Sequence, residues 1–318
     1  MPLKFVYVLV SDASVFYAEQ AAVSMHTLRL HNPRCRIVVA TDEKSLDFLT
    51  GSRSPVTKYA DEYVIVNSPS DFTLTQRSRF IKTSLRQEIA GDFLYLDSDT
   101  VVTGSLAELE NINCDVAAVY AKHTDFRTLN RTHPIMHRYY QLRGTDPGER
   151  YEPKDYFNGG VILCRDTGRS HLLFGKWHEF WLKSATAYDY NYDQADLWRA
   201  NACLNNVIVE LDGAYNCQMI CEKEVLRYIH QCKIFHYFSS SCRCWSWLND
   251  AAVLLDIRNN GISVELEKRT GTLTDEFLDN VAVISGEELT IYNMPLVATA
   301  RRLSGMYLNL MKKRSGRH

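Results

Sequence analysis

Short apolar runs alternate with stretches of helical periodicity along the first two thirds of this 318-residue chain. The first run, residues 4–10, is followed by residues 17–30, in which Ala21, Met25 and Leu28 keep a helical stripe. Strands that alternate with helices in this way pair mostly in parallel, with helices covering both faces of the sheet. The alternation therefore predicts an α/β fold with a mainly parallel central sheet.

The same alternation predicts the remaining elements up to about residue 240. Strands are expected at residues 36–40, 63–66, 93–97, 116–120, 156–164, 208–211 and 233–237, and helices at 42–49, 76–89, 172–183 and 193–202. The polar residues 121–155 are expected to form a long excursion with some helix, the usual place for substrate recognition. Because the pattern weakens beyond about residue 250, we predict a main domain over residues 1–248 and a smaller, largely helical extension over 249–318.

The amino-acid composition indicates the compartment in which the protein is found and the class of partner that it does not bind. A net charge of −2 produces no field that would draw the molecule onto nucleic acid, so no such partner is expected. The nine cysteines include no pair with a two-residue gap, which favours free thiols in a reducing compartment. No apolar run approaches the roughly 20 residues that span a bilayer, and the apolar start lacks a cationic leader. We therefore expect a cytoplasmic protein.

The C-terminal segment is basic and amphipathic. Residues 301–318 carry lysines and arginines but no acid, and apolar residues lie between them at i, i+3, i+4 spacing. Such a segment, over residues 300–318, can lie on an anionic membrane, which would make the protein peripheral on the cytoplasmic face. The alternatives are a terminal helix packed on its own domain, which explains the apolar stripe as well, and a frayed basic end.

Two acids one residue apart follow the apolar residues 93–96. Asp97 and Asp99 thus lie at the carboxyl end of a predicted strand, where an open α/β sheet presents its ligands. In a turn, acids with this spacing can converge on one hard cation such as Mg²⁺ or Mn²⁺ and leave most of its coordination shell open. The alternative is an ordinary surface turn rich in Asp and Ser.

Other polar side chains lie where they can serve a nucleotide or a sugar. Asp12 follows the first strand, where a carboxylate can accept from hydroxyls or an imide N–H, although a plain turn fits too. Arg79 and Lys82 lie on the helix before the acidic pair, where cations can meet a diphosphate or simply face solvent. Asn158 precedes two glycines at the start of an apolar strand, which indicates either close approach of a ligand or a β-bulge.

Two later segments complete the candidate residues. Asp193 and Gln194 open a predicted helix, where Asp193 either caps the helix or points into a cleft. His236 lies at the end of a short predicted strand. A lone histidine is usually a packed or surface residue, but with the acidic pair it is a candidate third metal ligand, because neutral imidazole binds Mn²⁺ well.

Six short segments occur in a fixed order between residue 5 and about residue 240. They are Val10-Ser11-Asp12, Arg79-Phe80, Tyr95-Leu96-Asp97-Ser98-Asp99, Phe157-Asn158-Gly159-Gly160-Val161, Asp193-Gln194 and Ile234-Phe235-His236-Tyr237. Together they resemble the family-8 retaining glycosyltransferases, which include glycogenin and bacterial lipopolysaccharide galactosyl- and glucosyltransferases. The resemblance implies a GT-A catalytic domain, a Rossmann-like nucleotide-diphosphosugar transferase fold. It also implies transfer of a hexose, glucose or galactose, with retention from a UDP-sugar to a saccharide or glycolipid acceptor.

The resemblance also implies residue roles. Asp97, Asp99 and His236 would bind Mn²⁺ or Mg²⁺. The nucleotide and its diphosphate would be served by Asp12, Arg79, Lys82, Asp97, Ser98 and Arg243, and the donor sugar and reacting centre by Asn158, Asp193 and Gln194. Two departures from the family stand out: Asn-Gly-Gly replaces the usual Asn-Ala-Gly, and Arg243 must replace the usual diphosphate lysine or nothing does. Retention through a covalent intermediate or through same-face attack stays open, with same-face attack favoured because glutamine is a poor nucleophile.

Two alternatives come from other functional classes. Residues 95–100 match the nucleophile motif of haloacid-dehalogenase-type phosphatases, in which Asp97 would attack phosphorus and Asp99 would act as acid and base. That motif normally opens its domain, whereas about ninety residues precede it here, and no later Gly-Asp-x-x-x-Asp cluster follows. A catalytically inactive sugar-binding relative is the second alternative, and it is disfavoured because every proposed ligand position is filled.

Overall fold

The computed structural model describes residues 3–51, 58–124, 155–219, 227–238, 247–280, 294–297, 299, 300, 302–304, 306 and 307. By internal contacts the chain divides into one unit of residues 1–274 and a second of residues 275–318. No helix within the described ranges is long and apolar enough to cross a membrane. Most of the predicted excursion at 121–155, and the end of the basic tail at 308–318, lie outside the described residues.

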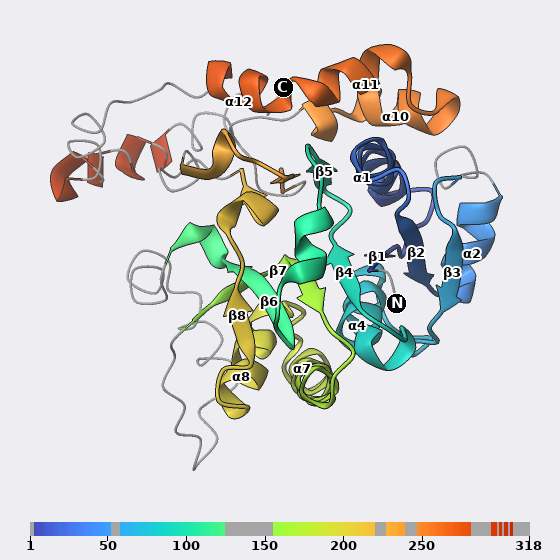
Figure 1. Ribbon diagram of the computed structural model, residues 1–318, viewed down its shortest axis with the longest axis vertical. Helices are drawn as coiled ribbons and strands as arrows, with labels where there is room; N and C mark the ends of the chain where they lie inside the picture. Colours follow the sequence, from blue (N-terminus) through green and yellow to red (C-terminus); the bar gives the residue numbers. More distant parts are fainter. Residues whose placement is uncertain are drawn as a thin grey trace. The chain divides into compact units, whose positions relative to one another are not determined.

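A seven-stranded sheet forms the centre of the first unit (Figure 1). Its strands are β1 (Lys4–Val8), β2 (Arg36–Thr41), β3 (Glu62–Ile65), β4 (Phe93–Leu96), β6 (Val116–Tyr120), β7 (Phe157–Cys164) and β8 (Ile208–Glu210). They lie in the order β3-β2-β1-β4-β7-β6-β8. Neighbours are parallel except where β7 meets β4 and β6. The predicted α/β fold with a mainly parallel sheet is confirmed.

The reversed direction of β7 brings its first residues to the edge where β4 ends. In the ladder Leu96 pairs with Val161, so Asn158, Gly159 and Gly160 lie beyond the last residue of β4. The N–H of Asp97 donates to the carbonyl oxygen of Gly160 at 2.8 Å and extends the contact by one step. The acidic pair and the Asn-Gly-Gly segment therefore meet at one edge of the sheet.

Helices cover both faces of this sheet. Because successive side chains of a strand point to opposite faces, Tyr7 faces α1 (Tyr17–His31), where its hydroxyl lies 2.9 Å from Ser24 Oγ. Val6 and Val8 face the other way, into a core shared with α4, α7 and α8. The bounds of the remaining helices of this region are α2 (Glu43–Thr50), α4 (Leu74–Glu88), α7 (Gly168–Tyr188) and α8 (Gln194–Cys203).

Helix α7 begins at Gly168, four residues before the predicted start at residue 172. The Thr167 side chain accepts from the Ser170 N–H, and the Ser170 hydroxyl accepts from the Thr167 N–H. This capping box satisfies N–H groups at the helix start, so the polar residues after Thr167 join the helix. Further along α7, Trp177 Nε1 donates to the carbonyl oxygen of Asp193 at 2.9 Å and ties α7 to the start of α8.

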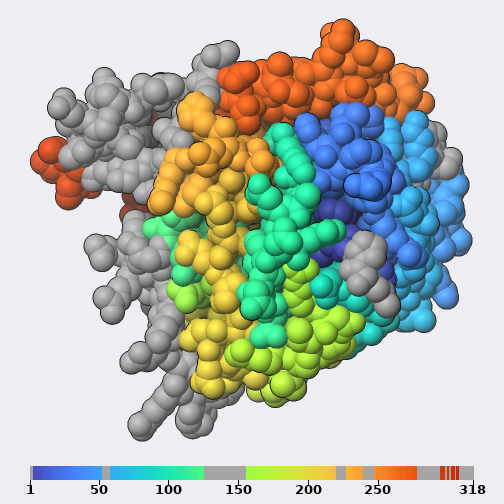
Figure 2. Space-filling model, in the orientation of Figure 1, coloured from blue at the N-terminus to red at the C-terminus, as the bar shows by residue number. Residues whose placement is uncertain are grey.

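A second, three-stranded sheet continues from the turn after β4. It consists of β5 (Thr100–Val102), β10 (Ile234–His236) and β9 (Cys217–Gln218). β10 runs antiparallel to β5 and places His236 opposite Thr100. In Figure 2 the surface of residues near 100 (teal) accordingly lies beside that of residues near 230 (yellow to orange). The predicted strand at 233–237 is confirmed, and it brings a distant part of the sequence to the acidic pair.

The described part of the predicted C-terminal extension is helical, as expected. It contains α10 (Ala251–Asn260), α11 (Val264–Gly271) and α12 (Leu273–Asn280). Helices α10 and α11 belong to the first unit, where His26 of α1 lies 2.8 Å from Glu267 of α11. The domain boundary after residue 248 stays a prediction.

Arg258 of α10 holds the loop that follows β1. Its Nε lies 3.0 Å from Oε1 of Glu19, a carboxylate with 0 % exposure. Its Nη atoms donate to the backbone oxygens of Ala13 at 3.2 Å and Val15 at 2.9 Å, and its guanidinium lies 4.2 Å from the ring centre of Phe16. One side chain of α10 therefore holds the loop after β1, although the two are far apart in the sequence.

Replacing Arg258 by methionine is expected to lower the free energy of unfolding by at least about 2 kcal/mol. The change keeps an apolar stem near Phe16 but removes the cation beside buried Glu19 and the bonds to two backbone oxygens. As a control, Arg36→Met removes an exposed ion pair with Glu62 and should cost below about 1 kcal/mol. Urea denaturation measures both. Equal midpoints for the two variants would contradict a role for Arg258 beyond that of a surface charge.

Candidate functional site

Asp97, Asp99 and His236 converge where β4 ends. One ligand atom from each residue lies within 4.8 Å of the other two. The two acids lie in the turn between β4 and β5, and the β5–β10 ladder brings in the histidine. His236 is buried, with Nε2 3.3 Å from Asp99 Oδ1, while the acids are half-buried. The structure thus brings together the three residues predicted as metal ligands.

Gly160 makes room for this cluster. A Cβ at this position would lie 2.3 Å from His236 Cε1 and 2.8 Å from Asp97 Oδ2, closer than such atoms approach. At Gly159 the nearest atom to an added Cβ would be Lys82 Nζ at 3.4 Å, an ordinary contact. Two carboxylates and an imidazole in a cradle that a single methyl group would fill are a donor set that fits a small divalent cation.

Asp97 is oriented through one of its two oxygens. Its Oδ1 accepts from the Tyr95 hydroxyl and lies 3.3 Å from Lys82 Nζ. Burial, and after it the carboxylate of Asp97, raises the pKa of Tyr95 well above its ordinary value, so the hydroxyl keeps the proton that it donates. The other oxygen, Oδ2, is the one that faces Gly160 and the cluster.

A row of charges links α4 to the start of α8. Lys82 Nζ lies 3.3 Å from Asp97 Oδ1 and also 3.3 Å from Asp193 Oδ2, and Arg79 Nε lies 3.3 Å from Asp193 Oδ1. Burial would raise the pKa of Asp193, but the charges of Arg79 and Lys82 bring it below its ordinary value. The Asp193 side chain makes no capping hydrogen bond to α8. It is turned instead toward the cations beside the acidic pair.

Gln194 and Asn158 adjoin the same array. Gln194 Oε1 lies 3.4 Å from the Gly159 nitrogen and 3.5 Å from Asn158 Nδ2. Asn158 Oδ1 accepts from the Gly160 N–H at 2.9 Å. Asp193 therefore contacts the cations beside the acidic pair, and Asn158 and Gln194 contact the two glycines next to the cluster.

Three further residues were predicted to serve the nucleotide: Asp12, Ser98 and Arg243. Asp12 is in the loop after β1, the neighbour of β4, where its Oδ1 accepts from the Ser14 N–H and hydroxyl at 2.8 and 2.6 Å. These hydrogen bonds lower the pKa of Asp12. Ser98 lies in the turn between the two acids. Arg243 belongs to residues 239–246, which lie outside the described ranges.

Asn216, which is completely buried beside the cluster, was not predicted from the sequence. It lies in the 3-10 turn Gly213–Asn216, and its Oδ1 is 2.9 Å from His236 Nδ1. The turn has no motif around it. Asn216 falls between the predicted strands at 208–211 and 233–237, where no periodic pattern or motif singles out one asparagine.

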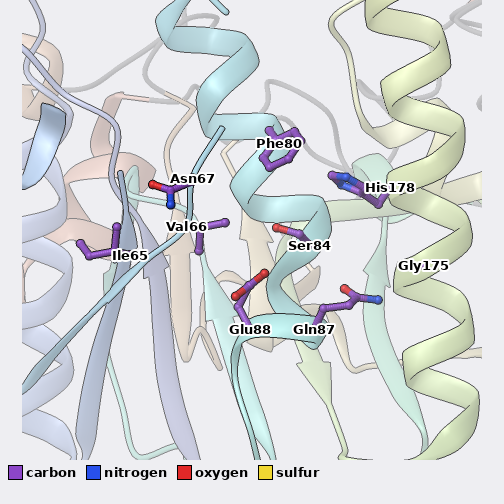
Figure 3. A pocket seen from close by; sticks show the side chains of 9 residues that line it. All are labelled: Ile65, Val66, Asn67, Phe80, Ser84, Gln87, Glu88, Gly175 and His178. Atoms are coloured by element: carbon purple, nitrogen blue, oxygen red, sulfur yellow. The ribbon is translucent and has the colours of Figure 1, made fainter. Parts of the chain in front are cut away.

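A surface hollow of about 560 Å³ lies between β3, α4 and α7 (Figure 3). It is lined by Ile65, Val66, Asn67, Phe80, Ser84, Gln87, Glu88, Gly175 and His178. With 3.6 residues per turn, the lining residues of α4 lie on the opposite side of the helix from Arg79 and Lys82. The hollow is therefore separate from the charged site.

The two glycines before β7 provide a matched pair of variants. Gly160→Ala is expected to destabilise the fold by about 1–3 kcal/mol, because the new methyl group must displace His236 or Asp97. Gly159→Ala should stay within about 0.5 kcal/mol, since it meets only ordinary contacts. Thermal unfolding in the presence of a chelator measures both without any contribution from bound metal. Equal losses of stability in the two variants would show that His236 and Asp97 leave enough space for a methyl group at Gly160.

Comparison with known proteins gives one strong match and several weak ones. The sequence matches the model of glycosyl transferase family 8 over residues 9–247. Among curated proteins none matches it. It is similar to the solved structure of galactosyltransferase LgtC in complex with donor and acceptor sugar analogues (17% identity, TM-score 0.49, 85% of this chain and 100% of that chain).

Two further solved structures show a comparable similarity. One is apo mouse xyloside xylosyltransferase 1 (14% identity, TM-score 0.48, 74% of this chain and 97% of that chain). The other is the glycosyltransferase GlyE of Streptococcus pneumoniae TIGR4 (18% identity, TM-score 0.49, 92% of this chain and 64% of that chain). The family match spans well over half of the chain and includes every candidate site residue. The chain therefore belongs to glycosyl transferase family 8 and is a glycosyltransferase with the GT-A fold that the sequence resemblance implied.

Proposed function

We propose that this glycosyltransferase moves a hexose, glucose or galactose, from a UDP-sugar to a saccharide or glycolipid acceptor, with retention and with Mn²⁺ or Mg²⁺ as cofactor. One observation carries the proposal: Asp97, Asp99 and His236 converge at the end of β4 in a chain of family 8. Two carboxylates and a neutral imidazole suit Mn²⁺. Three protein ligands leave roughly half of an octahedral shell for water or a diphosphate.

The residues around the cluster have distinct roles in this proposal. A cation held by Asp97, Asp99 and His236 would supply positive charge to the departing UDP. Arg79 and Lys82 add positive charge beside it, and Ser98 faces the diphosphate from the turn between the two acids. Asp12, at the end of the neighbouring strand, accepts from the ribose or the base. Arg243 is proposed to contact the diphosphate in place of the usual lysine.

Retention is proposed to proceed by attack from the face from which UDP leaves. A covalent intermediate would need a nucleophile, and Asp193 and Gln194 are the candidates. Each oxygen of Asp193 lies 3.3 Å from a cation, Arg79 or Lys82, which lowers its nucleophilicity. The amide of Gln194 is neutral and a poor nucleophile. We therefore assign Gln194, with Asn158, to contacts with the donor sugar.

Family membership argues against the phosphatase alternative, in which Asp97 is the nucleophile. The surroundings of Asp97 argue against it as well, because one oxygen accepts from Tyr95 and lies next to Lys82.

A catalytically inactive relative would bind the donor without turning it over. Release of UDP from UDP-glucose or UDP-galactose in the presence of MnCl₂ separates that case from an active enzyme.

Asp97→Asn combined with Asp99→Asn is expected to weaken UDP binding in the presence of MnCl₂ by more than about 100-fold, because two anionic ligands are lost. Calorimetry with UDP and MnCl₂ measures the loss. Asp47→Asn, an exposed acid on α2, is the matched control and should leave binding unchanged. Unchanged binding in the double variant would disprove the metal assignment. Rapid turnover of p-nitrophenyl phosphate would instead favour the phosphatase.

We also propose that residues 300–318 contact an anionic membrane. Among the described residues of this segment, Leu303, Met306 and Tyr307 are exposed and helical, at the predicted spacing. Deleting residues 300–318 is therefore expected to reduce co-sedimentation with vesicles that contain anionic lipid, while neutral vesicles bind neither form. Equal sedimentation of both forms with anionic vesicles would disprove the membrane contact.

A further inference from the structure

His236 is held by a chain of buried hydrogen bonds that starts at a backbone amide. The Gly160 N–H donates to Asn158 Oδ1 at 2.9 Å, and Asn216 Nδ2 lies 2.8 Å from the same oxygen. Asn216 Oδ1 in turn lies 2.9 Å from His236 Nδ1. Asn216 and His236 are 0 % and 1 % exposed, so bulk water has little access to these bonds. We call Gly160, Asn158, Asn216 and His236 the amide relay.

The direction of every bond in the amide relay follows from its first member. A backbone N–H can only donate, so the atom of Asn158 that faces Gly160 is the oxygen. That oxygen is an acceptor, so the atom of Asn216 that faces it is the NH₂ group. The other end of Asn216 is then its carbonyl oxygen, and it can only accept. His236 Nδ1 must therefore carry a hydrogen.

We propose that Asn216 is a positioning residue that holds neutral His236 in the tautomer with hydrogen on Nδ1, so that Nε2 presents its lone pair to the cation. Nε2 is the nitrogen that lies 3.3 Å from Asp99 Oδ1, on the side of the cluster. In the opposite tautomer an N–H would point into the cluster, and two lone pairs would face each other between Nδ1 and Asn216 Oδ1. The inference rests on the proposed metal site and adds the residue that prepares its histidine ligand.

The amide relay also ties the histidine to the proposed reacting centre. Asn158 is shared, because its Oδ1 serves the relay while its Nδ2 lies 3.5 Å from Gln194 Oε1. The same argument about donors fixes this contact, since the Gly159 N–H also faces Gln194 Oε1, at 3.4 Å. Both amide side chains are thus held in one orientation by backbone N–H groups of the Asn-Gly-Gly segment.

The first experiment uses the metal-free wild-type protein with ¹⁵N-labelled histidine. Under alkaline conditions NMR reports which ring nitrogen carries the hydrogen. The His236 signal is identified by its absence in His236→Gln. We expect hydrogen on Nδ1. Hydrogen on Nε2 would overturn the proposal without any further variant.

The second experiment compares three variants by the same NMR measurement and by titration with MnCl₂. Asn216→Leu removes the acceptor, so the preference for Nδ1–H is expected to be lost and Mn²⁺ affinity to fall by about 10–100-fold. Asn216→Asp keeps an acceptor and should keep the Nδ1–H tautomer. Gln218→Leu is the control: this buried amide two residues away bonds to Lys122 and Tyr120. It should change neither readout.

The outcomes separate the amide relay from simple packing and from the proposed function. Equal losses of affinity in Asn216→Leu and Gln218→Leu, or an unchanged Nδ1–H tautomer in Asn216→Leu, would overturn the positioning role. If the wild type binds no Mn²⁺, the proposed metal site fails, and the tautomer measured in the metal-free protein still decides whether Asn216 orients His236.

Discussion

The antiparallel pairing of β7 with β4 is the constraint on which the rest of the site depends. If β7 ran parallel to its neighbours, its first residues would lie at the opposite edge of the sheet, a strand length away from the acidic pair. Because it is reversed, the Asp97 N–H meets the Gly160 carbonyl, and the Asn-Gly-Gly segment adjoins the turn between β4 and β5. This pairing produces the close approach at Gly160, the first hydrogen bond of the amide relay and the contacts of Gln194.

The sequence allowed most of the fold to be predicted, because it depends on local periodicity. Apolar runs marked the strands, the helical stripe marked α1, and the position of Asp97 and Asp99 after a strand marked the edge that holds the site. His236 became a candidate metal ligand only when taken together with the acidic pair, and the family resemblance implied the same role. Local pattern places residues on a face of a strand or helix, and it does not give the pairing of strands that are far apart in the sequence.

The features that could not be predicted are those that depend on such distant pairing. Asn216 reaches His236 only because β9 lies beside β10, two short strands with little periodic signal of their own. Asp193 had two interpretations at the start of α8, and the choice between them needed the position of Arg79 and Lys82 on α4. Lys82 and Asp193 are buried, Arg79 is partly exposed, and the three charges share their contacts, so their contributions to stability and function are expected to be strongly non-additive.

The contacts of Arg258 with Glu19 and with the loop after β1 have a practical consequence for truncated forms of the protein. A fragment that stops at residue 248, the predicted end of the catalytic domain, would lack α10 and with it the cation that faces Glu19. That carboxylate would lose a buried counter-charge, and the segment from Ala13 to Phe16 would lose its outer support. Expression of a minimal catalytic fragment should therefore retain the chain through α11, even though none of the proposed ligands lies beyond residue 243.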